Sequence, residues 1–323
     1  MNLHENKDVF AAAIQLASTP KPEGGLGIKQ IYIEKDYWIF RSLKQLSECK
    51  ESGVTVFKGG TSLSKAYLLG NRFSEDIDIA ITSDFQRTDN QTKNIISRIS
   101  KVMSAGLEEV PNPATRKYSK YRKAFYRYPV ATENGIIGAI NPGQILLEIV
   151  SFANPYPYQK VFIKSFLTEY LENMGRNDII EAYGMQGFEI QVLAKSRTAT
   201  EKLVSLIRHS LSADYISELK AKIRHFYDLH FLWNDPESRA YLESAEFKTD
   251  FKALLSSDQA RFKEPEGWCD KKVSDSPLVS SFDKVWSELQ ETYSKELPEL
   301  AYQTIPSPES VAESFKELSV LLK

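Results

Sequence analysis

Two carboxylates in the run 76–81 (DIDIAI) are spaced for metal chemistry. Polar and apolar residues alternate here as they do in a β-strand, so Asp76 and Asp78 are expected on one face. Two like charges side by side destabilise a sheet unless a cation offsets them. A divalent ion with oxygen ligands would do so, most naturally Mg²⁺ bridging to substrate phosphates, with Mn²⁺ as a substitute. The competing interpretation is an ordinary pair of surface acids.

A turn of small residues lies just before these carboxylates. It follows the β-branched run 54–57, and a helical pattern begins at Thr61, which predicts a strand-to-helix turn. Backbone amides at such a turn can approach a ligand closely, and the helix N-terminus favours an anion. Most Gly-Gly turns only change the direction of the chain, but this one stands next to the acidic pair. Together they predict nucleotidyl transfer, with phosphates held by Lys58, Gly59, Gly60, Thr61 and Ser62.

A third carboxylate, Glu148, is the single acid in the run 144–150 (QILLEIV), which has the length of a strand. An unpaired charge inside such a strand is costly, so it requires a partner or a function. Glu148 could complete a two-metal site with Asp76 and Asp78. It could equally lie at an edge, facing water or pairing with a neighbouring lysine or arginine.

The segment 116–128 interleaves six cations with five aromatic residues, and no acid occurs from Pro111 to Thr132. Cations meet phosphates and aromatic faces stack on bases, so this mixture suits a single-stranded RNA or the acceptor end of an RNA. The same pattern fits a twisted hairpin whose rings pack inward and whose cations face water. The cations are Arg116, Lys117, Lys120, Arg122, Lys123 and Arg127.

Two helical regions flank these segments. A helix is predicted from about Glu34 to Leu46, with the charges 34–36 in its first turn. Taken alone, these charges indicate a solvated helix start, an interpretation that their place in the motif 33–38 described below weakens. Helices are also predicted over 200–211 and 215–233, where charges are expected at the surface. Those charges are Lys202, Arg224 and Asp228.

A proline-broken connector, 154–158 (NPYPY), separates a mixed region from a mainly helical one. We therefore predict two domains, a core over 1–155 and a mainly helical domain over 156–323.

The composition excludes several classes of protein. The chain has 323 residues with 42% hydrophobic content, which is normal for a globular protein. A net charge of -2 argues against a surface coated in positive charge, although a local basic patch is compatible with it. Cys49 and Cys269 form no disulfide framework or zinc motif, and neither a signal peptide nor a membrane span is evident. We expect a cytoplasmic protein without a membrane partner.

Three motifs together resemble the AbiEii family of nucleotidyltransferase toxins, which includes the mycobacterial MenT proteins. They are 33–38 (IEKDYW), 57–65 (FKGGTSLSK) and 72–78 (RFSEDID). The later segments 201–203 (EKL) and 224–229 (RHFYDL) also resemble helical motifs of that family. The resemblance spans roughly residues 30 to 235.

The resemblance implies an α+β fold, a DNA-polymerase-β-like nucleotidyltransferase core with a mixed sheet and helices, plus a mainly helical C-terminal part. It implies a Mg²⁺-dependent enzyme and a toxin of a bacterial toxin–antitoxin or phage-defence (abortive infection) system, with a separately encoded antitoxin. Some members add nucleotides to the 3′ end of tRNA. Carried over by motif, the turn 59–62 would hold the triphosphate, Asp76 and Asp78 would bind magnesium, and Lys202 and Asp228 match essential helical positions.

The expected reaction is attack of a hydroxyl on the α-phosphate of a nucleoside triphosphate, with pyrophosphate leaving. Magnesium on Asp76 and Asp78 would neutralise phosphate charge, and Lys202 would act as a point charge. Because Lys202 and Asp228 come from the helical half, the site is expected in a cleft between the halves. Two alternatives stay open: a small-molecule or protein nucleotidyltransferase on the same fold, and a non-catalytic binding protein of that fold.

Overall fold

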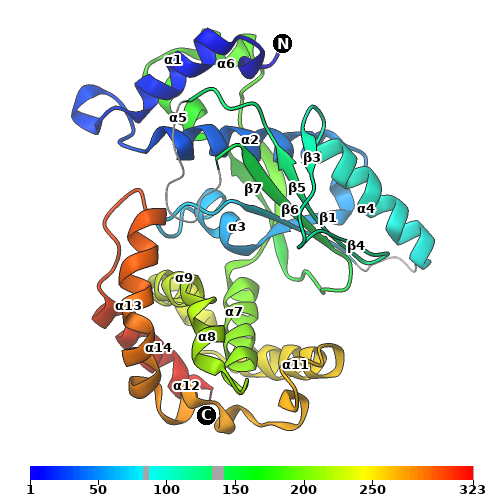
Figure 1. Ribbon diagram of the computed structural model, residues 1–323, viewed down its shortest axis with the longest axis vertical. Helices are drawn as coiled ribbons and strands as arrows, with labels where there is room; N and C mark the ends of the chain where they lie inside the picture. The colour runs from blue at the N-terminus through cyan, green and yellow to red at the C-terminus, as the bar shows by residue number, and fades with distance from the viewer. Residues whose placement is uncertain (83–86, 133–141, 323) are drawn as a thin grey trace. The chain divides into compact units, whose positions relative to one another are not determined.

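The computed structural model describes residues 1–82, 87–132 and 142–322 (Figure 1). The chain forms two compact units. Unit 1 comprises Met1–Leu68 and Phe73–Leu193, and unit 2 comprises Leu69–Arg72 and Ala194–Lys323. The chain therefore enters unit 2 twice, the first time through a segment of only four residues.

Unit 1 is built on a mixed sheet, which has eight strands in the described residues. The strand order is β3-β5-β6-β2-β1-β8-β7, and β4 pairs with β5 outside this path. β1 is antiparallel to β2 and parallel to β8, while β2 is parallel to β6. The strands are β1 (Thr55–Lys58), β2 (Asp76–Ile81), β3 (Glu108–Val110), β4 (Arg116–Lys117), β5 (Tyr121–Arg127), β6 (Gln144–Val150), β7 (Tyr158–Ile163) and β8 (Phe188–Leu193).

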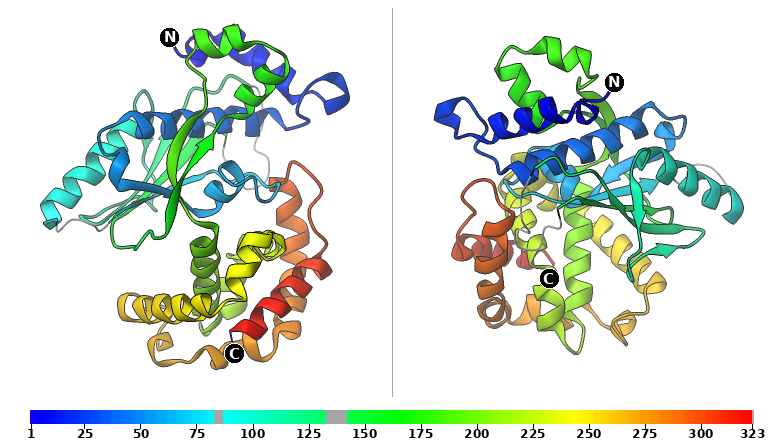
Figure 2. Two further views of the ribbon diagram at one scale, coloured as in Figure 1. Left: turned by 180° about the vertical axis from the view of Figure 1, so that it is seen from behind. Right: turned by 45° about the horizontal axis from the view of Figure 1, so that its top comes forward.

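Helices cover one face of this sheet. α2 packs on β6 and β8, α4 packs on β6, and α1 and α5 form a further layer against α2 (Figure 2). α4 begins with a capping box in which Thr88 accepts a hydrogen bond from the Gln91 amide. The helices of unit 1 are α1 (Lys7–Ser18), α2 (Gln30–Glu48), α3 (Gly59–Lys65), α4 (Asp89–Met103), α5 (Phe166–Asn173) and α6 (Asn177–Ala182), with 3-10 turns η1 (Leu3–Glu5), η2 (Lys21–Glu23) and η3 (Ser52–Val54).

The two carboxylate strands are confirmed: the alternation predicted for 76–81 and the strand predicted for the apolar run 144–150 are both present. The isoleucines of β2 and the apolar residues at 145, 147 and 149 of β6 are buried. Asp76, Asp78 and Glu148 point to the opposite face and are half-buried. We call this opposite face the acid face of the sheet.

Unit 2 is helical. α9 packs against α7, α10, α13 and α14, and an aromatic cluster of Phe226, Phe282, Trp286 and Phe315 fills the space between α9, α13 and α14. Its helices are α7 (Lys195–Ser210), α8 (Tyr215–Lys220), α9 (Ile223–Asn234), α10 (Pro236–Leu242), α11 (Ala245–Arg261), α12 (Pro277–Ser280), α13 (Phe282–Leu300) and α14 (Pro308–Leu321), with 3-10 turns η4 (Trp268–Asp270) and η5 (Val273–Asp275).

The single helix predicted over 215–233 is two helices, α8 and α9. The Lys222 amide bonds to the Leu219 carbonyl, three residues back, which ends the α-helical pattern of α8. The α+β class with a mainly helical C-terminal part is confirmed.

The structural division lies later in the chain than the connector at 154–158. β7 and β8 follow the connector, yet β8 pairs with β1 and β7 pairs with β8, so both belong to the sheet of unit 1. The predicted core over 1–155 therefore lacks two strands of the sheet. The chain passes from unit 1 to unit 2 between Leu193 and Ala194. No helix in the described part of the chain is long and apolar enough to cross a membrane.

Candidate active site

A row of four charged residues crosses the acid face on adjacent strands. Lys58 of β1 is opposite Asp78 of β2, Asp78 is opposite Glu148 of β6, and Glu148 is opposite Lys123 of β5. Residues directly opposite each other point to the same face. Asp76 precedes Asp78 by two positions and shares this face. The strand register therefore places two neighbouring carboxylates between two lysines.

The Asp78 carboxylate lies against the start of α3. Gly59, the first residue of α3, has φ +82, and a Cβ atom there would overlap Asp78 Oδ2. Only glycine adopts this conformation without strain and leaves room for the carboxylate. The predicted phosphate-binding turn and the predicted metal ligand are therefore in direct contact.

The hydroxyls of the turn hold it in place. Thr61 and Ser62 are buried. Thr61 Oγ1 donates to the Asp76 carbonyl and lies 2.9 Å from Ser74 Oγ, and Ser62 Oγ donates to the Gly59 carbonyl at 2.9 Å. In this structure both hydroxyls stabilise the turn and the start of β2, and their contact with phosphate stays a prediction.

Glu148 has a basic neighbour. Its Oε2 lies 3.7 Å from Lys123 Nζ, and burial together with Glu148 raises the pKa of Tyr121. Within residues 1–82, 87–132 and 142–322, no group of three or more His, Cys, Asp or Glu side chains is placed to hold a metal. The interpretation that Glu148 pairs with a lysine thus describes this structure, and its role as a third ligand stays a prediction.

Asp76 and Asp78 by themselves fit a magnesium ion. Mg²⁺ is commonly held by one or two carboxylates, with substrate phosphates and water as the other ligands. The two side chains share one strand face, beside a turn suited to phosphate. When bound, Mg²⁺ would neutralise phosphate charge.

The basic segment forms a hairpin of β4 and β5. Tyr126 and Tyr128 are buried, whereas Tyr118 is 62% exposed. The two buried rings support the interpretation of this segment as a hairpin whose rings pack inward. Its exposed cations remain available to a ligand. By register, Arg116, Lys123 and Arg127 share the acid face, whereas Lys117 and Arg122 point to the other face.

Several of these cations have acidic partners. Lys117 pairs with Glu109, Arg127 with Glu108 at 3.6 Å, and Lys120 with Asp89 at 3.0 Å. All of these side chains are more than one-third exposed, and such pairs contribute little free energy. A polyanion can therefore replace the acids at small cost.

The charges Glu34, Lys35 and Asp36 are buried, so the predicted solvated helix start is wrong. α2 begins at Gln30, which puts them in its second turn. Consecutive helical residues point about 100° apart, so the three side chains leave α2 in three directions. Each one finds a separate partner, which offsets the cost of burying its charge.

The partners belong to three different segments. Glu34 accepts hydrogen bonds from the Ala131 amide and the Thr132 hydroxyl, and Lys35 pairs with Glu75. Asp36 pairs with Lys65 at the end of α3 and accepts from the Phe166 amide at 2.8 Å. Burial raises the pKa of Glu34 and lowers that of Lys35, while Glu75 and Asp76 oppose the shift of Lys35. Composition alone gives no signal of this burial.

Unit 2 contains a buried ionic cluster of Arg72, Lys202 and Asp228. Arg72 Nε and Nη2 donate to the two Asp228 oxygens at 2.8 and 2.7 Å, and Lys202 Nζ donates to Oδ2 at 2.7 Å. All three residues are at most 6% exposed. Burial would raise the pKa of Asp228, but Arg72 and Lys202 outweigh it and hold the pKa well below its usual range.

The surface positions predicted for Lys202 and Asp228 are therefore wrong. Asp228 lies between Tyr227 and Leu229, which are both fully buried. The sequence did contain a signal of this burial, namely an acid placed between apolar and aromatic residues. Arg72 was missed as its partner because nothing in the sequence pairs residues 156 positions apart.

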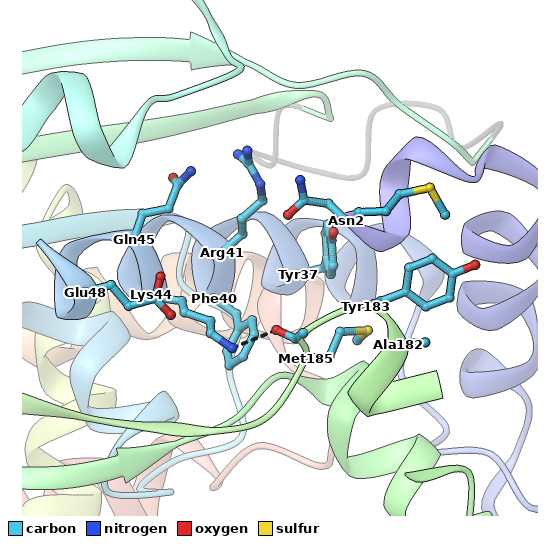
Figure 3. Close-up of a pocket in the computed structure, with 12 residues that line it drawn as sticks. Asn2, Tyr37, Phe40, Arg41, Lys44, Gln45, Glu48, Ala182, Tyr183 and Met185 are labelled. Carbon is cyan, nitrogen blue, oxygen red and sulfur yellow. Dashed lines mark hydrogen bonds between the residues drawn. The ribbon is translucent and has the colours of Figure 1, made fainter. Parts of the chain in front are cut away.

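A hollow of about 350 Å³ lies elsewhere in unit 1 (Figure 3). It is bounded by the N-terminal residues, α2 and the segment after α6, where Lys44 Nζ donates to the Gly184 carbonyl at 2.7 Å. None of the predicted site residues lines it. Its lining is Met1, Asn2, Tyr37, Phe40, Arg41, Lys44, Gln45, Glu48, Ala182, Tyr183, Gly184 and Met185.

A family model and two solved structures are similar to this chain. The family model described as "Nucleotidyl transferase AbiEii toxin, Type IV TA system" matches residues 41–317, and no curated protein matches the chain. A solved structure from H. pylori, assigned as a nucleotidyltransferase, is similar at 17% identity over 90% of this chain and 94% of that one, with a TM-score of 0.47. MenT4, a nucleotidyltransferase toxin from Mycobacterium tuberculosis H37Rv, is similar at 16% identity over 98% and 99%, also with a TM-score of 0.47. Because the family model covers most of its length, the chain belongs to the AbiEii family of nucleotidyltransferase toxins of type IV toxin–antitoxin systems.

Proposed function

We propose that this protein transfers a nucleoside monophosphate from a nucleoside triphosphate to the 3′ hydroxyl of tRNA. One observation carries the proposal: Asp76 and Asp78 share the acid face, and the Asp78 carboxylate lies against Gly59 where α3 begins. Groups suited to a divalent metal and to phosphate are thereby adjacent. In the reaction a new bond forms between the hydroxyl oxygen and the α-phosphorus, the α–β phosphoanhydride bond breaks, and pyrophosphate leaves.

Different residues of the chain would bind the metal ion, bind the phosphates and offset negative charge. Asp76 and Asp78 would hold Mg²⁺ or Mn²⁺, and the backbone amides of Gly59 and Gly60 would bind phosphate oxygens. Thr61 fixes the Asp76 peptide through its hydroxyl. Lys58, in the same row as Asp78, would offset negative charge.

Lys202 and Asp228 are retained as functional residues because they match the family's helical motifs. Within unit 2, Asp228 orients both Lys202 and Arg72. We therefore propose that Asp228 acts as a positioning residue. In this proposal Lys202 supplies positive charge that offsets the negative charge of the triphosphate.

The basic hairpin supports an RNA acceptor. Arg116 and Arg127 are exposed, and with Lys123 they share the acid face with Asp76 and Asp78. Two exposed arginines and a half-buried lysine on the face of the acidic pair suit an extended polyanion more than a small molecule. The family also implies a separately encoded antitoxin, and we propose a role in phage defence.

The test incubates the purified protein with total RNA, Mg²⁺ and each α-labelled nucleoside triphosphate in turn. We expect label on tRNA with wild-type protein and none with Asp78→Asn. The matched control is Asp178→Asn, which removes an exposed acid from the same unit. Label on no RNA, or undiminished label with Asp78→Asn, would overturn the proposal. Label on a protein or a small molecule would favour the alternative nucleotidyltransferases.

A further inference from the structure

The segment that leads into the acidic strand is held by α2. The Tyr32 ring stacks on Phe73, with centroids 5.1 Å apart and an interplanar angle of 10°. Lys35 pairs with Glu75, the residue directly before Asp76. The Lys35 side chain is 1% exposed and that of Glu75 is 27% exposed. Burying an ammonium is costly, and the ion pair with Glu75 offsets part of that cost and fixes the chain at position 75.

The same segment is held from a second side by α3. Thr61 Oγ1 contacts Ser74 Oγ and the Asp76 carbonyl. The residues 73–76 therefore have a contact from α2 or α3 at every position. Such anchoring matters most just before a metal ligand, because small displacements of a ligand weaken metal binding.

We propose that Lys35 is a positioning residue for the metal-binding carboxylates, and that it acts through Glu75 on Asp76. This inference rests on the proposed function, since it assumes that Asp76 and Asp78 bind the metal. The ion pair also holds the Glu75 carboxylate against α2. Lys35 itself contacts neither substrate nor metal in this role.

The test measures Mn²⁺ binding directly by electron paramagnetic resonance of the free ion, at a temperature well below each variant's thermal midpoint. We expect Lys35→Met to weaken Mn²⁺ binding by about 10- to 100-fold. Glu75→Gln should have a similar effect, and the double variant should be no worse than either single one, because both changes break the same ion pair. Should Lys35→Met fail to fold, the double variant, which removes both members of this ion pair together, carries the test.

The matched control is Glu51→Gln. Glu51 is a buried acid of unit 1 that pairs with Arg98 at 2.6 Å, so its loss should lower stability and leave Mn²⁺ affinity unchanged. Folded Lys35 variants with wild-type Mn²⁺ affinity would overturn the inference, as would an equal loss in Glu51→Gln. Asp78→Asn separates the two hypotheses. If it too binds Mn²⁺ normally, the proposed metal site is wrong; if it alone loses binding, only the role of Lys35 is wrong.

Discussion

Asp228 of unit 2 is enclosed by two cations and withdrawn from solvent, whereas Asp76 and Asp78 of unit 1 stand on one strand face and remain half-buried, with Glu148 on the next strand. In the first region the fold itself neutralises the carboxylate. In the second region Asp78 and Glu148 lie next to each other in a row that Lys58 and Lys123 flank, and a bound cation would offset the remaining repulsion between the carboxylates. We infer that the first carboxylate mainly organises its surroundings and that the acidic pair serves chemistry.

The largest expected effect tests the acid face. Asp78→Asn should lower kcat by about a thousandfold or more, because a bound metal contributes several kcal/mol of transition-state stabilisation. Its free energy of unfolding should stay close to that of wild type, because the substitution relieves repulsion with Glu148 and weakens attraction to Lys58 at the same time. Steady-state kinetics and urea denaturation measure the two quantities, and Asp178→Asn is the control. A large loss of stability in Asp78→Asn would show that Asp78, like Asp228, mainly stabilises the fold.

The complementary change is Asp228→Asn. It leaves Arg72 and Lys202 buried without their carboxylate and should lower the free energy of unfolding by about 3–5 kcal/mol. Urea denaturation measures this loss. Glu243→Gln, which removes an exposed partner of Arg239 in the same unit, should change stability by less than about 1 kcal/mol. Equal losses in the two variants would refute the structural role.

The pH dependence of that loss follows from the lowered pKa of Asp228. The carboxylate contributes its stability above the ordinary value of 3.8 and loses it as the pH falls towards the lower folded value. The difference between wild type and Asp228→Asn should therefore be constant from about pH 5 to 7 and shrink below about pH 4. Unfolding curves at several pH values test this, and a difference that grows on acidification would contradict it.

A smaller effect is expected at Gly59. Gly59→Ala introduces a side chain at φ +82 and against Asp78 Oδ2, which should cost about 1–2 kcal/mol of stability and reduce activity by at least about tenfold. Gly53→Ala is the matched control, because a Cβ there meets no atom within 4 Å. Thermal melts and transfer assays measure both effects. Full activity of Gly59→Ala would show that the close approach of Asp78 is unimportant.

The smallest effect concerns the exposed cations, which contrast with the buried Arg72 and Lys202. Replacing Arg116 or Arg127 by alanine should weaken RNA binding and reduce the slope of log affinity against log salt by about 0.7 for each phosphate that the variant no longer neutralises. Lys117→Ala, on the opposite face of the hairpin, should change the slope less. Filter binding of tRNA at several salt concentrations provides the slopes. Identical slopes in all three variants would argue against this surface as the RNA site.

The elements of the acid face were predictable from local patterns. Strict alternation gave β2, and the apolar run with one acid gave β6 with the bounds that the structure shows, Gln144–Val150. The change from a β-branched run to a helical pattern gave the turn at Gly59. These signals are local, because neighbouring residues alone decide which side of a strand faces the core.

The buried charges were not predictable in this way. Lys35 and Asp228 look like surface residues because their burial depends on Glu75 and Arg72, which are distant in sequence. The strands β7 and β8 were missed as parts of the sheet for a similar reason. Their membership rests on the pairing of β8 with β1, across more than a hundred residues, and no local pattern encodes that pairing.

The short excursion of the chain through Leu69–Arg72 limits how this protein can be divided. A fragment beginning at Ala194 would contain every helix of unit 2 but lack the guanidinium that binds Asp228 and the backbone bridge between Arg72 and Ala301. Proteolysis or truncation at that junction should therefore yield a helical piece that melts at a lower temperature than the intact chain. A gene fragment that encodes only residues 194–323 therefore does not encode all of unit 2, because Leu69–Arg72 is encoded between two parts of unit 1.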